Sequence, residues 1–148
     1  MNTPRSSEPI VGLMLVAALM MGPTCVGASD SAAVSTAAVS ELMTRDLIGA
    51  PGKEVLMITV TYRPGGASLP HRHDAQVFVY VLEGEITMQL KGGAPMTLHP
   101  GQSFYEGPND IHQVSANAGH SAPAKILVFM VKDKAKPASR EVTDEAAT

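Results

Sequence analysis

Histidines are the residues of this sequence best suited to chemistry, and they stand at positions 71, 73, 99, 112 and 120. His71 and His73 lie two residues apart in a segment that reads as extended, and such residues of a β-strand project to the same face. His112 opens a later apolar segment, so a third imidazole can arrive from a neighbouring strand. Three neutral imidazoles suit one divalent transition metal ion (Fe, Mn, Ni, Cu or Zn) and leave coordination positions open.

Other roles for these histidines are open on spacing alone. A His-x-His pair on a strand can be solvent-exposed or can hydrogen-bond to neighbouring backbone, in which case the domain is structural and its histidines only pack. His99 precedes Pro100 and Gly101, and His120 lies in the loop 117–123. We expect both of these to be solvated turn residues rather than ligands.

The segments that must position the histidines are short and β-like. Apolar residues alternate or come in short runs, broken by turn-forming residues about every 8 to 12 positions. The 13 glycines and 11 prolines exceed average usage, which favours many turns. This pattern predicts an all-β sandwich or barrel. Candidate strands are residues 41–47, 53–63, 68–73, 76–82, 85–90, 96–99, 103–105, 112–116 and 124–131.

The residues around the histidines resemble the two motifs of the cupin family. The stretch 65–84, which contains His71 and His73, is similar to the first motif, and the stretch 100–117, which contains His112, is similar to the second. The resemblance implies a single-domain, cupin-like jelly-roll β-barrel with a metal ion inside. Because small cupins commonly pair through their sheets, it also implies a homodimer.

One departure from the family pattern concerns the metal ligands. The glutamate of the first motif would fall at position 77, where this chain has Val77. Gln76 is the nearest polar residue, but its side chain points to the opposite face of the strand unless a β-bulge near residues 74–75 shifts the register. The expected ligands are therefore His71, His73 and His112, with Gln76 as a fourth ligand only if that bulge is present.

An ion held by imidazoles alone keeps its full positive charge and favours an anionic oxygen ligand. Our first hypothesis is a metal-dependent dioxygenase or lyase/isomerase acting on a compact anionic substrate. Strand parity places Val77, Val79 and Val81 in the barrel interior, so we expect a small apolar pocket. The alternative is a non-catalytic module that binds a metal or small ligand, because no activated serine or suitably paired carboxylates are evident. Tyr105 and Glu106 are the nearest candidates for an acid or base, or else are packing residues.

The N-terminal stretch predicts export. Residues 10–21 form an unbroken apolar run of 12 residues, too short for a membrane helix, which needs about 20. The run has the length of a secretory signal core, and small residues at 26–28 suit cleavage after Ala28. The alternative is a lipoprotein signal acylated at Cys25. We expect residues 1–28 to be removed, giving a secreted or periplasmic protein without a membrane span.

Composition sets the remaining boundaries. Residues 29–40 are small and of low complexity and are expected to form a tether, and the charged stretch 132–148 is expected to form a flexible tail, leaving 41–131 for the barrel. The formal net charge of -3 offers no basic excess for nucleic acid, and a single cysteine excludes an internal disulfide. The expected partner is a small molecule.

Overall fold

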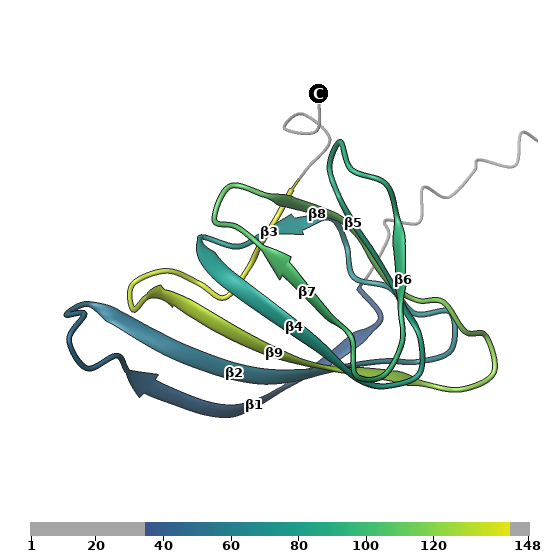
Figure 1. The fold of residues 1–148 in the computed structure, drawn as a ribbon, viewed down its shortest axis with the longest axis horizontal. Coiled ribbons are helices and arrows are strands. Elements are labelled where there is room, and N and C mark those ends of the chain that lie inside the picture. Colours follow the sequence, from purple (N-terminus) through teal and green to yellow (C-terminus); the bar gives the residue numbers. More distant parts are fainter. Residues whose placement is uncertain (1–34, 143–148) are drawn as a thin grey trace, which may run out of the picture. The chain divides into compact units, whose positions relative to one another are not determined.

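The computed structural model describes residues 35–142, which fold entirely as β-structure (Figure 1). No helix of this described range is long and apolar enough to cross a bilayer. The expected signal sequence, residues 1–28, lies outside the described residues, as do residues 29–34 of the expected tether.

The strands of residues 35–142 form two antiparallel sheets of five strands each (Figure 1). The first sheet has the order β1 (Ala37–Asp46), β2 (Lys53–Tyr62), β9 (Ala124–Asp133), β4 (Ala75–Glu83) and β7 (Ser103–Glu106). The second has the order β10 (Arg140–Glu141), β3 (His71–Arg72), β8 (Ile111–Asn117), β5 (Ile86–Leu90) and β6 (Met96–Leu98). Strands distant in sequence are neighbours in both sheets, and the predicted all-β, cupin-like jelly roll is confirmed.

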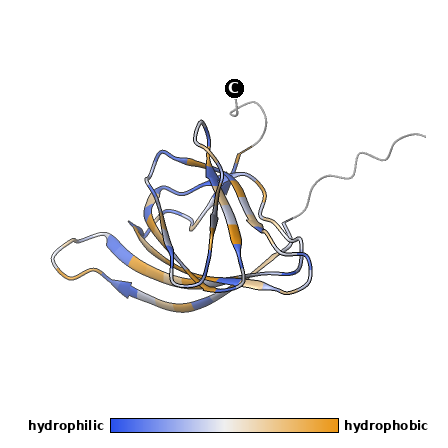
Figure 2. Ribbon diagram, turned by 45° about the vertical axis from the view of Figure 1, so that its right-hand side comes forward, coloured by the Kyte–Doolittle hydropathy of each residue, from blue (hydrophilic) through white to orange (hydrophobic). Residues whose placement is uncertain are grey.

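The core lies between the sheets because alternate residues of the strands are apolar and point inward. On β4, Val77, Val79 and Val81 are each at most 2% exposed, and Ile86 and Met88 of β5 are fully buried. Figure 2 shows the corresponding mixture of orange and blue segments along the strands. The strand parity expected from the sequence is therefore confirmed for these interior positions.

At its N-terminal end the barrel begins earlier than the sequence indicated. Residues 37–40, placed in the expected tether, form the first part of β1 and pair with residues 59–62 of β2. The Thr36 amide also donates to the Ala67 carbonyl at 2.9 Å. Backbone hydrogen bonds hold residues 36–40 in place, so the segment needs no large side chains. Amino-acid composition does not reveal such backbone pairing.

The described part of the expected flexible tail, residues 132–142, also packs on the barrel. β9 continues to Asp133, and the Lys132 ammonium, only 6% exposed, lies 2.6 Å from the Glu54 carboxylate. Further along, β10 pairs with β3, and Arg140 lies 2.7 Å from Asp74. Charged side chains that suggested a solvent-exposed tail, Lys132 and Arg140, instead form ion pairs with residues of the barrel. We call residues 134–142 the C-terminal strap.

Candidate metal centre

Three imidazoles meet inside the barrel. His71 in β3 is the direct cross-strand partner of His112 in β8, and His73 comes immediately after β3, two residues beyond His71. The ring centroid of His71 lies 4.9 Å from that of His73 and 5.1 Å from that of His112. One ligand nitrogen from each ring lies within 4.8 Å of the other two. The convergence expected from strand parity is therefore confirmed.

The Nδ1 atom of each of these imidazoles is held by an oxygen acceptor. The acceptors are the Leu69 carbonyl for His71 (2.7 Å), the Ala138 carbonyl of the C-terminal strap for His73, and Glu106 Oε1 for His112 (3.1 Å). Since carbonyl and carboxylate oxygens only accept, each neutral ring carries its proton on Nδ1 and keeps its lone pair on Nε2. His112 Nε2 is buried without a hydrogen-bond partner. Outer partners of this kind orient metal-binding histidines, so the three rings fit a divalent ion.

Glu106, which the sequence suggested as a nearby acid or base or else as a packing residue, lies directly against the histidine cluster. It ends β7, is 2% exposed, and places Oε2 3.8 Å from His73 Nε2. Burial acts to raise the pKa of this carboxyl, but the hydrogen bond from His112 and the charges of the three imidazoles outweigh burial and hold the pKa below its ordinary value. The centre thus contains an ionised carboxylate beside its three imidazoles.

Gln76 lies outside this cluster. Its side chain is exposed, between the buried Ala75 and Val77. The pairing of β4 with β9 runs without a shift from Ala75 to Val81, so the bulge that would turn Gln76 inward is absent there. The structure therefore corrects the expectation of a possible fourth ligand at this position.

The two remaining histidines lie where the sequence placed them. His99 and His120 are both exposed, in connecting segments. His99 pairs with Glu85 at 3.3 Å on the surface. Neither belongs to the cluster of His71, His73 and His112.

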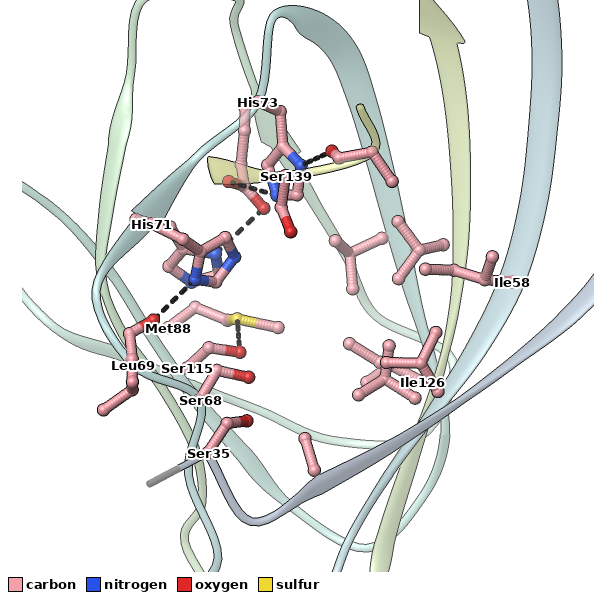
Figure 3. A pocket seen from close by; sticks show the side chains of 18 of the residues that line it. Ser35, Ile58, Ser68, Leu69, His71, His73, Met88, Ser115, Ile126 and Ser139 are labelled. Atoms are coloured by element: carbon pink, nitrogen blue, oxygen red, sulfur yellow. Dashed lines mark hydrogen bonds and ion pairs between the residues drawn. The ribbon is translucent and has the colours of Figure 1, made fainter. Parts of the chain in front are cut away.

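A pocket of about 190 Å³ adjoins the imidazoles. Figure 3 shows His71 with Ser68 and Ser115 along one side and Ile58 and Ile126 on the other. The serine hydroxyls are bridged by the Tyr62 hydroxyl, 3.1 Å from Ser68 Oγ and 2.7 Å from Ser115 Oγ. The volume lies below the roughly 300 to 1,000 Å³ of drug-sized sites, so the pocket suits a compact molecule.

Charge in the pocket is one-sided. Of the lining residues within 35–142, none is lysine or arginine, and the acidic ones are Glu106 and Glu141. An anionic ligand would find no side-chain ammonium or guanidinium there. Any positive charge that holds such a ligand has to come from a bound metal ion or from protonated imidazoles.

The fold and these contacts define an all-β barrel with a histidine cluster that can hold one metal ion. Residues 58–130 match the family model of the cupin domain. This match, together with the structural neighbours below, supports placing the chain in the cupin superfamily. A search of the curated proteins gave no match.

Solved structures of similar fold include two enzymes. The DMSP lyase DddQ from Ruegeria pomeroyi DSS-3 is 20% identical with a TM-score of 0.52, covering 60% of this chain and 43% of the lyase. An oxalate oxidase in complex with the substrate analogue glycolate is 23% identical with a TM-score of 0.58, covering 82% and 62%. The cupin-2 domain Rru_A2000 from Rhodospirillum rubrum is 17% identical with a TM-score of 0.58, covering 80% and 74%. The chain spans less than half of the lyase and less than two thirds of the oxidase, and these likenesses establish the fold.

Acid should destabilise the metal-free protein through His71. Burial is the main cause that lowers the pKa of His71, and the neighbouring imidazoles of His112 and His73 lower it further. The hydrogen bond to the Leu69 carbonyl acts in the opposite direction but does not cancel these effects. Below its ordinary pKa near 6.5 the unfolded chain binds a proton that the folded chain does not, so the free energy of unfolding falls as pH falls through that value, until the lowered pKa is passed. Urea unfolding at pH 7.5, 6 and 5 should show this slope in the parent and a smaller slope in His71→Gln. The exposed His120→Gln variant is the matched control and should keep the pH dependence of the parent. If His71→Gln also keeps the full pH dependence of the unfolding free energy, His71 is not its source.

Proposed function

We propose that the chain is an exported metal-dependent enzyme of dioxygenase or lyase/isomerase type. It holds one divalent transition metal ion at His71, His73 and His112 and acts on a compact anionic substrate. The observation that carries the proposal is the grouping of three imidazoles, each with Nδ1 bonded to an oxygen acceptor and each offering one ring nitrogen within 4.8 Å of the other two. A DMSP lyase and an oxalate oxidase are among the solved structures of similar fold, and this supports the proposal.

Different parts of the pocket would contact different parts of the substrate. When bound, the ion supplies a Lewis acid that attracts an anionic oxygen of the substrate. Ile58 and Ile126 form an aliphatic wall against which an apolar part of the substrate packs. The hydroxyls of Ser68 and Ser115 offer hydrogen bonds on the opposite side. Without lysine or arginine in the described lining, the pocket favours a single anionic group over a dianion.

The second candidate function is a module that binds a metal or small ligand without turnover. It is favoured by the hydroxyls of the pocket, since Ser68 and Ser115 bond to Tyr62 rather than to a histidine that would activate them. Glu106 is the carboxylate beside the cluster and is already engaged by His112.

Metal loading and turnover together test these candidates. Purified protein stripped with a chelator should regain about one equivalent of Fe(II), Mn(II), Co(II) or Zn(II), and its melting temperature should rise, because an ion that binds the folded state stabilises it. Oxygen consumption and product formation would then be measured with small hydroxy acids, diketones, catechols and thiols. If the protein binds metal but turns over none of these compounds, the binding module is favoured. If neither the ion nor the chelator changes the melting temperature, both candidates are contradicted.

We also propose that the protein acts outside the cytoplasm as a secreted or periplasmic protein. The support is the apolar run at residues 10–21 with small residues at 26–28. Mass spectrometry of the protein expressed with its full N-terminus should give a mature chain beginning at Ser29. An uncleaved cytoplasmic product would contradict export.

A homodimer is proposed from the outer face of the first sheet. Phe78, Tyr80 and Tyr105 are 44%, 46% and 49% exposed there, and Phe78 lies 5.3 Å from Tyr105 and 6.1 Å from Phe129 between ring centroids. The outer face of an antiparallel sheet is usually polar, so a cluster of aromatics suits a second copy of the chain.

The dimer is expected to dissociate when this cluster is made acidic. Phe78→Glu buries a charge in the proposed interface, and light scattering coupled to size-exclusion chromatography should then give the monomer mass. Ile48→Glu is the matched control, because Ile48 is fully exposed in the turn after β1. A parent protein that is monomeric at every concentration would contradict the proposal.

A further inference from the structure

Glu106 is a buried acid whose ion-pair contacts within the described residues include no lysine or arginine. Within residues 35–142, its ion-pair contacts are with His73 and His112, and its Oε2 atom has no hydrogen-bond partner. Two cations of the described barrel pair with other carboxylates, Lys132 with Glu54 and Arg140 with Asp74. A buried carboxylate costs free energy unless opposite charge compensates it. A dication held by the imidazoles would supply that charge.

The place of Glu106 in the sheet explains how it reaches the centre. On β7 it is the direct cross-strand partner of Val77 on β4, and both side chains are buried, at 2% and 0% exposure. Directly opposed residues of antiparallel strands project to the same face, with Cβ atoms about 4.5 to 5.5 Å apart. A buried carboxylate therefore lies beside position 77, where the first cupin motif would have its glutamate, but it comes from the neighbouring strand.

We infer, on the basis of the proposed metal site, that Glu106 is a positioning residue that holds His112 for the ion. Oε1 accepts the Nδ1 proton of His112, which leaves Nε2 free and facing the other rings. Phe104 stacks on the same imidazole, with centroids 5.9 Å apart and an interplanar angle of 28°. Glu106 is not among the residues whose ligand atoms all lie within 4.8 Å of one another, so it acts through His112 rather than by coordination.

Cobalt binding to matched variants tests this role. Glu106→Ala removes the acceptor and should weaken Co(II) binding about 10- to 100-fold, as the loss of an outer partner of a ligating histidine does. Glu106→Gln keeps an acceptor oxygen and should bind closer to the parent, with the same visible absorption bands. Glu85→Gln is the matched control, because it alters the exposed pair with His99 and should leave affinity unchanged.

The outcomes separate this inference from the proposed metal site. If the parent takes up no Co(II), the metal site and the role of Glu106 both fail. If the parent binds and Glu106→Ala binds equally well, only the positioning role fails. If Glu106→Gln shifts the absorption bands as strongly as loss of a histidine, Glu106 is itself a ligand and the positioning role is overturned.

A measurement without metal covers the case in which Glu106→Ala does not fold. Long-range ¹H–¹⁵N correlation spectra of the metal-free parent should show neutral His112 protonated on Nδ1. In Glu106→Gln the amide nitrogen competes to donate, so the Nε2-protonated tautomer of His112 should gain population. A parent spectrum with the His112 proton on Nε2 would overturn the inference.

Discussion

Replacing His112 by alanine is expected to weaken the binding of a divalent ion at least about 100-fold. Multidentate sites in small domains bind with an apparent free energy on the order of 10 kcal/mol, so one of three nitrogens accounts for about 3 kcal/mol, or roughly 150-fold in Kd. The substitution also removes the hydrogen-bond donor of the buried Glu106. That loss should lower the melting temperature of the metal-free protein as well.

Isothermal titration with Zn(II) or Co(II), and elemental analysis of the purified protein, measure this loss. The matched control is His120→Ala, which removes an exposed imidazole from a loop and should bind like the parent. A His112→Ala protein with the same metal content as the parent would mean that the ion lies elsewhere. Circular dichroism at the assay temperature ensures that the variant compared is folded.

Replacing Gly84 by alanine is expected to cost about 2 to 5 kcal/mol of unfolding free energy. Gly84 has φ +70, in the left-handed region where an L-residue costs about 1 to 2 kcal/mol. A Cβ atom there would lie 2.8 Å from the Ala124 Cα and Cβ atoms and 2.9 Å from the Pro123 carbonyl oxygen. Backbone cannot move aside cheaply, so overpacking adds about 1 to 3 kcal/mol.

Gly92→Ala separates the two causes. Gly92 has a similar φ of +81 but nothing within 4 Å of an added Cβ, so only the conformational cost of about 1 to 2 kcal/mol applies. Urea unfolding of both variants beside the parent gives the difference directly. Equal losses at the two positions would show that the contact with Ala124 and Pro123 relaxes without cost.

Local sequence patterns predict a large part of this fold and site. Alternation along Val77, Val79 and Val81 correctly gives the inward face of β4. The two-residue spacing of His71 and His73 correctly gives a shared direction. These features depend on backbone geometry within one strand, which adjacent residues determine.

Contacts between residues of different strands could not be predicted from the sequence. Glu106 reaches the centre only because β7 pairs with β4 in the register that sets it opposite Val77. Register between strands depends on packing of the whole barrel, which a single sequence does not display. The placement of the C-terminal strap has the same origin, since Lys136 and Arg140 pair with Asp74, a residue far away in the chain.

The hydrogen bond between His73 and the Ala138 carbonyl joins the candidate metal centre to a segment beyond the stretch that matches the cupin domain. Fraying of residues 138–142 would release one imidazole, so occupancy of the centre and docking of this segment are thermodynamically reciprocal. An ion that favours the ordered His73 must protect the Val142 amide, which donates to Pro70, from solvent exchange. Solvent exchange at the Val142 amide would thus measure whether an ion is bound at the histidine cluster.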